Sequence, residues 1–452
     1  MMQFELTREF ITELKEAIDS SDEIRILDLI GELHPADIAE ILNDLPSQQA
    51  KRLLQYVDAE KASEAVADLD EEDQRQILEE YSPTEIAETF IENLDSDDAV
   101  DLLQELPEEK KEEVIGLLDD LQQAGDIVDL LNYEEGTAGA IMAKELVSID
   151  SNLSVKDALV ELRKQADEVE QIYTVYVIDN NQRLLGRLSL KKLLVSKTNA
   201  KIENLYVHGI KSVKATDNQE EVAHIMKKYD LVALPVVDDL GRLVGRITID
   251  DAVDVLSEEA EKDYQMASGL SEDIESTDSV WMITRARLPW LILGLLGGIL
   301  GARVIAIYES ELHVYPEMAF FIPLVAAMAG NVGVQSSAIV VKGLANNTLG
   351  LGGLGQQLFK EFTVALINAA VCSVMLFIYN TVYSSSNELS YTVSLALLAV
   401  IVFAALFGTL VPMVLDKYKV DPALATGPFI TTVNDITGLL IYFAIGRMMY
   451  GM

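Results

Sequence analysis

Cysteine and histidine are scarce in this sequence of 452 residues, which contains one cysteine and four histidines. The lone cysteine, Cys372, excludes an intramolecular disulfide and any metal site built from several thiolates. So few histidines, with no phosphate-binding loop and no nucleophile elbow, argue against an enzyme. The starting segment MMQFELTREF has no basic stretch followed by an apolar run, so the N-terminal half is expected to stay in the cytoplasm.

Basic residues are also few, since 34 lysines and arginines stand against 74 acids and give a formal net charge of -40. Residues 276–452 hold nine acids and eight bases, so almost the whole excess lies in the first 275 residues. Such a segment repels nucleic acid and anionic lipid headgroups and attracts cations. Solubility alone is the ordinary explanation for acidic surfaces. We expect no nucleic-acid partner.

The C-terminal part has the opposite character, with five apolar segments long enough to cross a bilayer core as helices of about 20 residues. They lie near residues 288–308, 318–341, 362–384, 391–415 and 423–446. Lysine and arginine concentrate in the connections on the side of the acidic half, which predicts a multi-pass protein with a cytoplasmic N-terminus. Because five is odd and no inverted repeat is visible, a homodimer with a shared central pathway is the simpler expectation.

One acid, Asp435, interrupts the fifth apolar segment. A charged Asp at a span centre costs about 2.5–3.5 kcal/mol, so it should face a wet cavity or a cation. Oxygen donors without His or Cys suit hard cations, and a sparse set of carboxylates favours Mg2+, which sheds its water reluctantly. Polar residues in spans can also be interhelical hydrogen-bond partners, and a membrane Asp can relay protons. The other candidate pore donors are Asn331, Gln335, Thr431 and Asn434.

Residues 137–257 contain an internal repeat. VYVIDNNQRLLGRLSLKKLL at 175–194 returns as LPVVDDLGRLVGRITIDDAV at 234–253. Each copy is typical of a strand, a tight turn, a second strand and a helix. The repeat resembles a pair of CBS domains, an α/β module that senses adenine nucleotides.

The second copy carries the Gly-x-x-Thr-x-x-Asp pattern as Gly245, Thr248 and Asp251. The resemblance implies that these residues bind an adenine nucleotide such as ATP, with the aspartate on the ribose hydroxyls. In the first copy, Ser189 and Lys192 stand at the matching places. Any nucleotide site is therefore expected in the second copy.

Residues 1–130 have apolar residues at three- and four-residue spacing, and Asp, Ser or Pro stands where the helices should begin. Segments such as LHPADIAEILNDLP and LDSDDAVDLLQELP resemble each other, which predicts a superhelix of stacked helical hairpins. Acids also recur at helical spacing, where like charges repel unless a cation neutralises them. A solvated helix face is the alternative reading. These acids are Asp97 and Asp101 and, after the repeat, Asp251, Asp254, Glu258, Glu259 and Asp263.

The order of these parts, with the span motifs GNVGVQSS and VNDITGLLIY, resembles the MgtE family of magnesium channels and transporters. The resemblance covers essentially the whole chain. It implies a homodimer in a bacterial-type cell membrane, with a central pore that binds hydrated Mg2+ at Asp435. The implied domains are an all-α superhelical N domain at 1–130, a tandem CBS pair at 131–255, a connecting plug helix at 256–280 and a five-helix membrane pore domain at 281–452.

The resemblance also implies regulatory Mg2+ bound between domains when intracellular Mg2+ is high, so that the plug is held against the pore. Lys262 stands where at least one relative has an acid. The implied ligands are Asp97, Asp101, Glu220, Asp230, Asp251, Asp254, Glu259 and Asp263.

The sequence therefore favours a Mg2+-gated channel that imports Mg2+. Two alternatives stay open. The first is a proton-coupled divalent cation exchanger that uses Asp435 as its proton carrier. The second is a membrane-anchored sensor of adenine nucleotides, in which the spans serve only as anchors.

Overall fold

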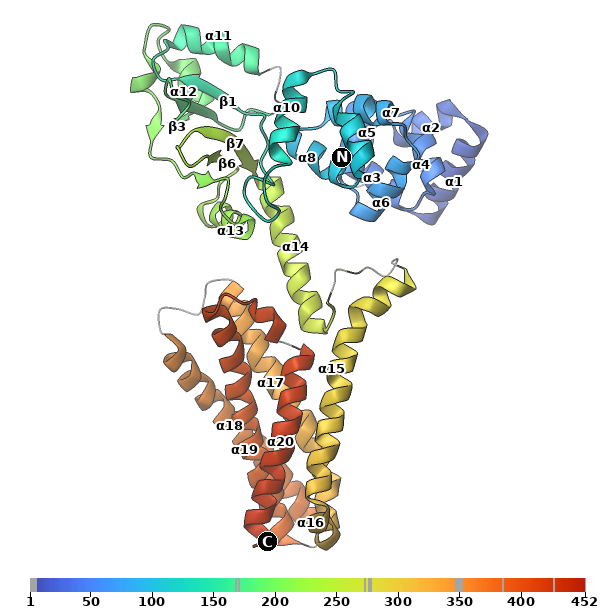
Figure 1. Ribbon diagram of the computed structural model, residues 1–452, viewed down its shortest axis with the longest axis vertical. Helices are drawn as coiled ribbons and strands as arrows, with labels where there is room; N and C mark the ends of the chain where they lie inside the picture. Colours follow the sequence, from blue (N-terminus) through green and yellow to red (C-terminus); the bar gives the residue numbers. More distant parts are fainter. Residues whose placement is uncertain are drawn as a thin grey trace. The chain divides into compact units, whose positions relative to one another are not determined.

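The computed structural model describes residues 6–166, 169, 171–271, 274, 279–345, 353–383, 386–425 and 427–451. The chain divides into two compact units, Met1–Ser257 and Glu258–Met452. Figure 1 shows helices and sheets in the first unit and long helices in the second. The predicted classes of all three regions are confirmed: an all-helical N domain, a CBS pair with sheets, and five apolar helices.

The N domain consists of short α-helices of 7 to 13 residues. Polar side chains cap them, as at Asp58 and Asp70, whose carboxylates accept first-turn N–H groups. Helices two apart in sequence pack together, α3 on α5, α5 on α7 and α7 on α9, which builds the superhelix. The helices are α1 (Arg8–Ser20), α2 (Glu23–Ile30), α3 (Pro35–Asn43), α4 (Ser47–Leu54), α5 (Ala59–Ala67), α6 (Glu71–Glu79), α7 (Pro83–Thr89), the 3-10 turn η1 (Ile91–Asn93), α8 (Ser96–Gln104), α9 (Glu108–Ile115) and α10 (Leu121–Leu130).

The CBS pair has one sheet in each half, and each repeat supplies an antiparallel strand pair, as its sequence predicts. A strand upstream of each repeat adds to it in parallel, β1 on β2 and β5 on β6. The strands are β1 (Val147–Asp150), β2 (Val175–Ile178), β3 (Leu184–Leu188), β4 (Val207–His208), β5 (Val213–Lys214), β6 (Ala233–Val237) and β7 (Leu243–Thr248). The helices are α11 (Val155–Gln165), α12 (Leu190–Val195), the 3-10 turn η2 (Ile202–Asn204) and α13 (Gln219–Tyr229).

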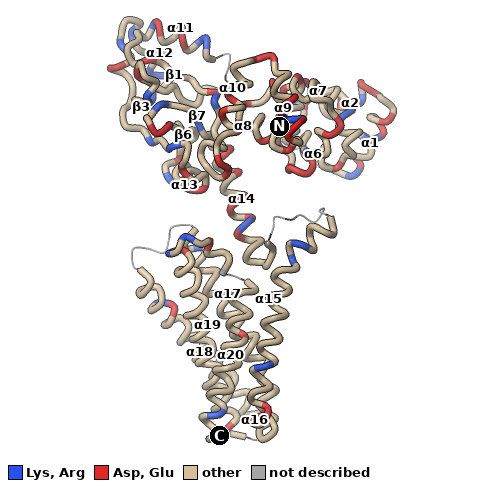
Figure 2. Tube along the Cα trace, in the orientation of Figure 1, with Lys and Arg blue, Asp and Glu red and all other residues tan. Residues whose placement is uncertain are grey.

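Helix α14 (Ile249–Ser268) leaves β7 directly and runs for 20 residues. Its first half belongs to the first compact unit and its second half to the second. Figure 2 shows acidic residues along this helix and across the N domain. The predicted plug segment, 256–280, holds the rest of α14 and the start of the first span; its residues 272, 273 and 275–278 lie outside the described residues.

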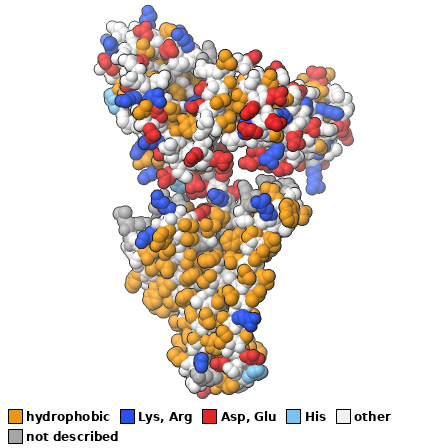
Figure 3. All heavy atoms as spheres, viewed as in Figure 1, with side chains coloured by type: hydrophobic (Ala, Val, Ile, Leu, Met, Phe, Trp, Pro, Cys, Tyr) orange, Lys and Arg blue, Asp and Glu red, His pale blue; other side chains and the backbone are white. Residues whose placement is uncertain are grey.

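Within its described residues, the second unit contains five helices long and apolar enough to cross a membrane, in agreement with the predicted number. Helix α19 packs against α18, α17 and α20, and α15 packs against α20. Apolar side chains cover the face of the spans visible in Figure 3. The elements are α15 (Val280–Ile307), α16 (Glu309–Val314), the 3-10 turn η3 (Pro316–Phe321), α17 (Ile322–Ala345), α18 (Gly353–Tyr383), α19 (Asn387–Lys417), the 3-10 turn η4 (Pro422–Ala425) and α20 (Gly427–Tyr450).

Candidate ion sites

Asp435 lies half-buried on α20, where this helix crosses a glycine of α17. A Cβ atom placed on Gly330 would lie 3.2 Å from Asp435 Oδ1 and 3.0 Å from Thr431 Cγ2. The Thr431 hydroxyl donates to the Gly427 carbonyl at 3.0 Å, so it is satisfied within its own helix. Glycine at 330 thus lets the carboxylate approach the backbone of α17 closely.

The remaining predicted pore donors separate into two groups. Asn331 and Gln335, one turn apart on α17, are exposed in the single chain. Asn434 is fully buried, and a Cβ atom on Gly333 would overlap its Nδ2 atom. Among the described residues, neither amide atom of Asn434 has a hydrogen-bond partner. Asn434 therefore belongs to the α17–α20 contact, whereas Asn331 and Gln335 present polar groups on an otherwise apolar surface.

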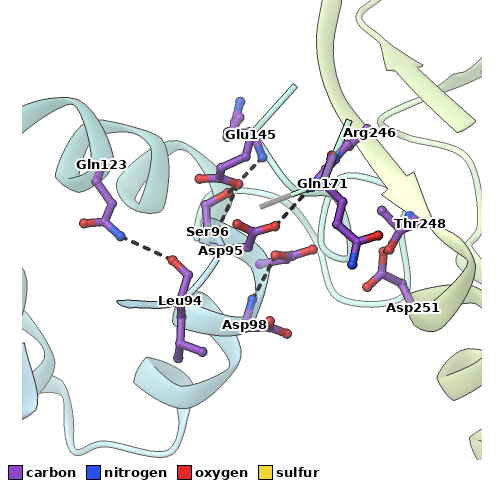
Figure 4. Close-up of polar contacts among 12 residues, drawn as sticks. Leu94, Asp95, Ser96, Asp98, Gln123, Glu145, Gln171, Arg246, Thr248 and Asp251 are labelled. Carbon is purple, nitrogen blue, oxygen red and sulfur yellow. Dashed lines mark hydrogen bonds and ion pairs between the residues drawn. The ribbon is translucent and has the colours of Figure 1, made fainter. Parts of the chain in front are cut away.

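In the first unit, the start of α8 faces the start of α14, and acids from both helices meet (Figure 4). Asp97 is 9% exposed and accepts a hydrogen bond from the Asp98 N–H at 3.1 Å. Asp251 accepts from the Thr248 N–H at 2.7 Å and from its hydroxyl at 2.8 Å. We call Asp97, Asp98 and Asp251 the acidic interface. The hydrogen-bond donors to Asp97 and Asp251 are neutral groups, and within the described part of the chain none of the three carboxylates forms an ion pair with Lys or Arg.

Proton affinity in the acidic interface is correspondingly high. Burial, with the nearby charge of Asp251, raises the pKa of Asp97 well above its ordinary value. The same two causes raise the pKa of Asp98 to about 7. Burial also raises the pKa of Asp251, against the opposing hydrogen bonds from Thr248. Carboxylates in this position bind either protons or a cation, and oxygen-only ligands suit Mg2+.

Two further acids adjoin this interface. One carboxylate oxygen each of Asp95, Asp97 and Glu145 lies within 4.8 Å of the others, a spacing that could hold a metal ion. Protein donors already occupy part of this group, because Glu145 Oε2 accepts from the Ser96 N–H at 3.1 Å and from its hydroxyl at 2.8 Å. Asp95 pairs with Arg246 at 3.1 Å.

Other predicted regulatory acids lie elsewhere. Glu220 is in the first turn of α13 and Asp230 is its C-cap, and both are exposed. Ten residues of helix separate them by about 15 Å, so one chain cannot bring both to one ion. Asp101 is exposed on α8, while burial and Asp250 raise the pKa of Asp254. Glu259 and Asp263 are partly buried on the α14 segment of the second unit.

Structural roles account for the three residues of the nucleotide motif. A Cβ atom on Gly245 would lie 2.6 Å from Met142 Sδ and 2.9 Å from the Ala143 carbonyl oxygen, so glycine is required for this packing. Thr248 and Asp251 are joined by the hydrogen bonds given above, which close the first turn of α14. Asp251 thus serves the fold and the acidic interface together.

Four residues of this region are absent from the sequence-based prediction: Asp95, Asp98, Glu145 and Arg246. Asp98 could have been found from the sequence by its helical spacing, because it follows Asp97 in the first turn of α8 and precedes Asp101 by three residues. Arg246 could also have been found, as a charge inside an apolar strand. Asp95 and Glu145 could not, since their meeting depends on how α8 packs against the CBS pair.

Three family models match the chain in the order of its domains. The MgtE intracellular N domain matches residues 33–136. The CBS domain matches residues 138–197 and 202–258. MgtE, described as a divalent cation transporter, matches residues 322–445.

Curated relatives extend over nearly the full length. A magnesium transporter MgtE of Bacillus subtilis is 35% identical over 417 residues, covering 92% of each chain. Another, of Thermus thermophilus, is 32% identical and covers 96% of this chain and 97% of its own. One of Enterococcus faecalis is 39% identical over 72% of each chain.

Solved structures match the soluble part. The cytosolic domain of the Mg2+ channel MgtE in complex with ATP is 33% identical, with a TM-score of 0.51, and covers 54% of this chain and 99% of its own. The soluble part of a magnesium transporter is also 33% identical, with a TM-score of 0.50, and covers 56% of this chain and 98% of its own. The chain belongs to the MgtE family of magnesium transporters.

Proposed function

We propose that the chain is a Mg2+-selective channel that imports Mg2+ and is closed by Mg2+ on its soluble side. One observation carries the transport half of this proposal: Asp435 holds a carboxylate against Gly330 inside an apolar bundle. An acid at membrane depth needs water or a cation, and a hydrated Mg2+ supplies both. The relatives named above are magnesium transporters, which supports Mg2+ as the ion.

The pathway belongs to a homodimer in this proposal. Asn331 and Gln335 lie one turn apart and are exposed in the single chain, where lipid would leave their amides without hydrogen bonds. Two copies of α17 and α20 around a shared axis would give these amides water and would place two Asp435 carboxylates opposite one dication.

The acidic interface supports the gating half of the proposal. Asp97, Asp98 and Asp251 are crowded together and, among the described residues, form no ion pair with Lys or Arg, so their repulsion opposes the docking of the N domain on the CBS pair. Mg2+ removes that repulsion and stabilises the docked form. To move the ratio of closed to open channels from 1:99 to 99:1, Mg2+ must bind the closed state about 5.5 kcal/mol more tightly than the open state. A difference of this size favours several ions acting together.

The end of α14 is suited to act as the plug. A Cβ atom on Gly427 would overlap the carbonyl oxygen of Ala267, and one on Gly269 would lie 2.7 Å from Pro428 Cγ. The last turn of α14 therefore rests on the first turn of α20, about two helical turns before Asp435. A movement of α14 would therefore be transmitted through this contact to α20 and would displace the Asp435 carboxylate.

ATP is a further ligand in this proposal. Its support is the ATP complex of the related cytosolic domain and the motif Gly245, Thr248 and Asp251. Because Asp251 also belongs to the acidic interface, ATP at this place would compete with N-domain docking. Calorimetric titration of ATP into the full chain tests the assignment, and the absence of binding heat would remove it.

Patch recording of the reconstituted protein tests the main proposal. Raising the Mg2+ concentration on the side of the soluble domains is expected to close the channel, so that the current falls while the same patch is being recorded. Current that ignores this step would overturn Mg2+ gating. Flux that stops when the proton gradient is abolished at constant membrane potential would indicate a proton-coupled exchanger, and no ion flux at all would leave the nucleotide-sensor alternative.

Asp98→Asn is expected to reduce the Mg2+-dependent change in open probability by about tenfold, because one ligand worth about 1.5–3 kcal/mol is lost from the closed state. The ratio of open probability in chelator to that in saturating Mg2+ measures it. Glu109→Gln, which removes an exposed acid of α9, is the charge-matched control and should keep the wild-type ratio. Equal ratios for both variants would contradict the role of the acidic interface.

A further inference from the structure

Helices α17 and α18 are joined by a hydrogen bond inside the membrane unit. The Ser336 hydroxyl of α17 donates to Glu361 Oε1 of α18 at 2.6 Å. This length is typical of a hydroxyl that binds an ionised carboxylate. Ser336 is 4% exposed, and Glu361 is partly buried. Within the described part of the chain no Lys or Arg forms an ion pair with Glu361, so this carboxylate depends on the serine hydroxyl.

Glu361 lies close to the border of the hydrocarbon core. Helix α18 has 31 residues and is therefore about 46 Å long, whereas the core is about 30 Å thick. Glu361 is about 12 Å from the first residue of this helix, and Phe359, Phe362 and Ile367 around it are exposed, as lipid-facing side chains are. A carboxylate at this depth can extend to the membrane surface. Glu361 binds Ser336 instead, so its role lies inside the bundle.

The bond connects two helices that have little other contact. Helix α17 packs along α19 and α20, and α18 packs along α19. The direct contact between α17 and α18 is small, and the Ser336–Glu361 bond is its polar part. Figure 2 shows how few acidic residues lie along the spans. One of these few acids is therefore used to tie α18 to α17.

The place of Ser336 on α17 determines what this tie can do. Ser336 follows Gln335 directly and lies one turn after Gly333, which rests against Asn434 of α20. Successive residues of a helix are turned by about 100°, so a tie from Ser336 to α18 turns Gln335 away from α18. Asn331, one turn before Gln335, is turned with it. The bond with Glu361 thus fixes the direction of both exposed amides of α17.

We propose that Glu361 is a positioning residue for ion transport: through Ser336 it sets the rotation of α17 and so directs Asn331 and Gln335 into the ion pathway. The inference rests on the pathway proposed above, in which these two amides face water. Glu361 acts through α17 and does not bind the transported ion.

Thiol labelling of the full chain in lipid nanodiscs tests this role. The parent protein carries Cys372→Ser, which removes the lone cysteine, and Gln335→Cys, which places a reporter on the exposed face of α17. Its rate of reaction with a charged methanethiosulfonate in chelator measures how far the thiol at position 335 faces water. Ser336→Ala and Glu361→Leu are each expected to lower this rate by about tenfold, because α17 loses its tie. The double variant should show no further loss, since both changes remove the same bond.

Two further variants separate the bond from general damage. Glu361→Gln keeps an oxygen acceptor in the same place and is expected to restore the parent rate to within about threefold. Thr363→Ala is the matched control on α18, since the Thr363 hydroxyl donates to the Phe359 carbonyl of its own helix at 2.9 Å. It should react at the parent rate. With the native residues at 335 and 372, Ser336→Ala is expected to raise the Mg2+ concentration for half-maximal uptake by about tenfold.

The outcomes distinguish this role from the pathway on which it rests. A parent thiol that does not react would place Gln335 away from water and would defeat the proposed pathway. A reactive parent thiol whose rate is the same in Ser336→Ala and Glu361→Leu would overturn the role of Glu361 alone. Losses that add up in the double variant would also overturn it, because the two residues would then act independently. Ser336→Ala keeps the test decisive if the elution volume shows that Glu361→Leu fails to fold.

Discussion

Asp435→Ala is expected to lower Mg2+ flux through the reconstituted protein by about tenfold or more. The carboxylate is the single acid of α20 and lies against Gly330 of α17. A charge-assisted contact is worth about 1.5–3 kcal/mol, and a passing dication that loses it meets an apolar stretch without compensation. Uptake into liposomes that contain a Mg2+ indicator measures the effect. Asp435→Asn should show nearly the same loss, since it keeps the shape and removes the charge.

The control for this experiment is Asp416→Asn, which removes an exposed acid near the end of α19 and should leave uptake unchanged. Equal elution volumes in size-exclusion chromatography would show that the variants are folded alike. Normal uptake by Asp435→Ala would refute the pore assignment, and the transport proposal would then lose the observation that carries it.

The number of spans could be predicted from the sequence, because each span is one continuous run of apolar residues long enough to cross the bilayer. The residues at which the helices begin and end could not be predicted. The first span was expected near 288–308, and α15 begins at Val280. The third was expected near 362–384, and α18 begins at Gly353. Hydropathy detects only the part of a helix that lies in hydrocarbon, whereas the helix continues for as long as its backbone bonds and caps permit. At α15 the Ser279 hydroxyl provides such a cap for the Met282 N–H.

The acidic interface was only partly predictable for a related reason. Helical spacing correctly grouped Asp97 with Asp101 on α8, but packing buries the first and leaves the second exposed. Spacing along one helix cannot indicate which face meets another domain. Two sequence patterns named Asp251, the helical spacing of acids after the repeat and the Gly-x-x-Thr-x-x-Asp motif. In the structure Asp251 lies near Asp98. A partner such as Arg246, 151 residues from Asp95, is outside the reach of any local pattern.

Asn434 illustrates the same limit inside the membrane unit. Its place beside Asp435 suggested a pore donor, but one residue along a helix turns the side chain by about 100°. It points at Gly333 instead, in a contact that only glycine allows. Polarity in a span identifies a residue that needs a partner, and the three-dimensional packing decides whether that partner is an ion or a helix.

Gly408→Ala is expected to destabilise the membrane unit strongly. A Cβ atom at this position of α19 would overlap the carbonyl oxygen of Gly333 and lie 3.1 Å from its carbonyl carbon and Cα. These are backbone atoms of α17, so no side-chain rotation can relieve the overlap and the two helices must separate. Overpacking costs about 1–3 kcal/mol in ordinary cores, and a backbone clash belongs at the upper end. Thermal unfolding in detergent, followed by loss of the monodisperse elution peak, measures the change.

The matched controls are Gly298→Ala on α15 and Gly355→Ala on α18, where an added Cβ atom has nothing within 4 Å. Alanine is the better helix former by about 1 kcal/mol, so these variants should be as stable as wild type or slightly more so. If Gly408→Ala unfolded at the same temperature as the controls, the close crossing of α17 and α19 would not exist in the membrane. The crossing matters for transport as well, because Gly333 also contacts Asn434, one residue from Asp435. Separation of the helices should therefore displace the carboxylate and lower Mg2+ uptake in parallel with stability.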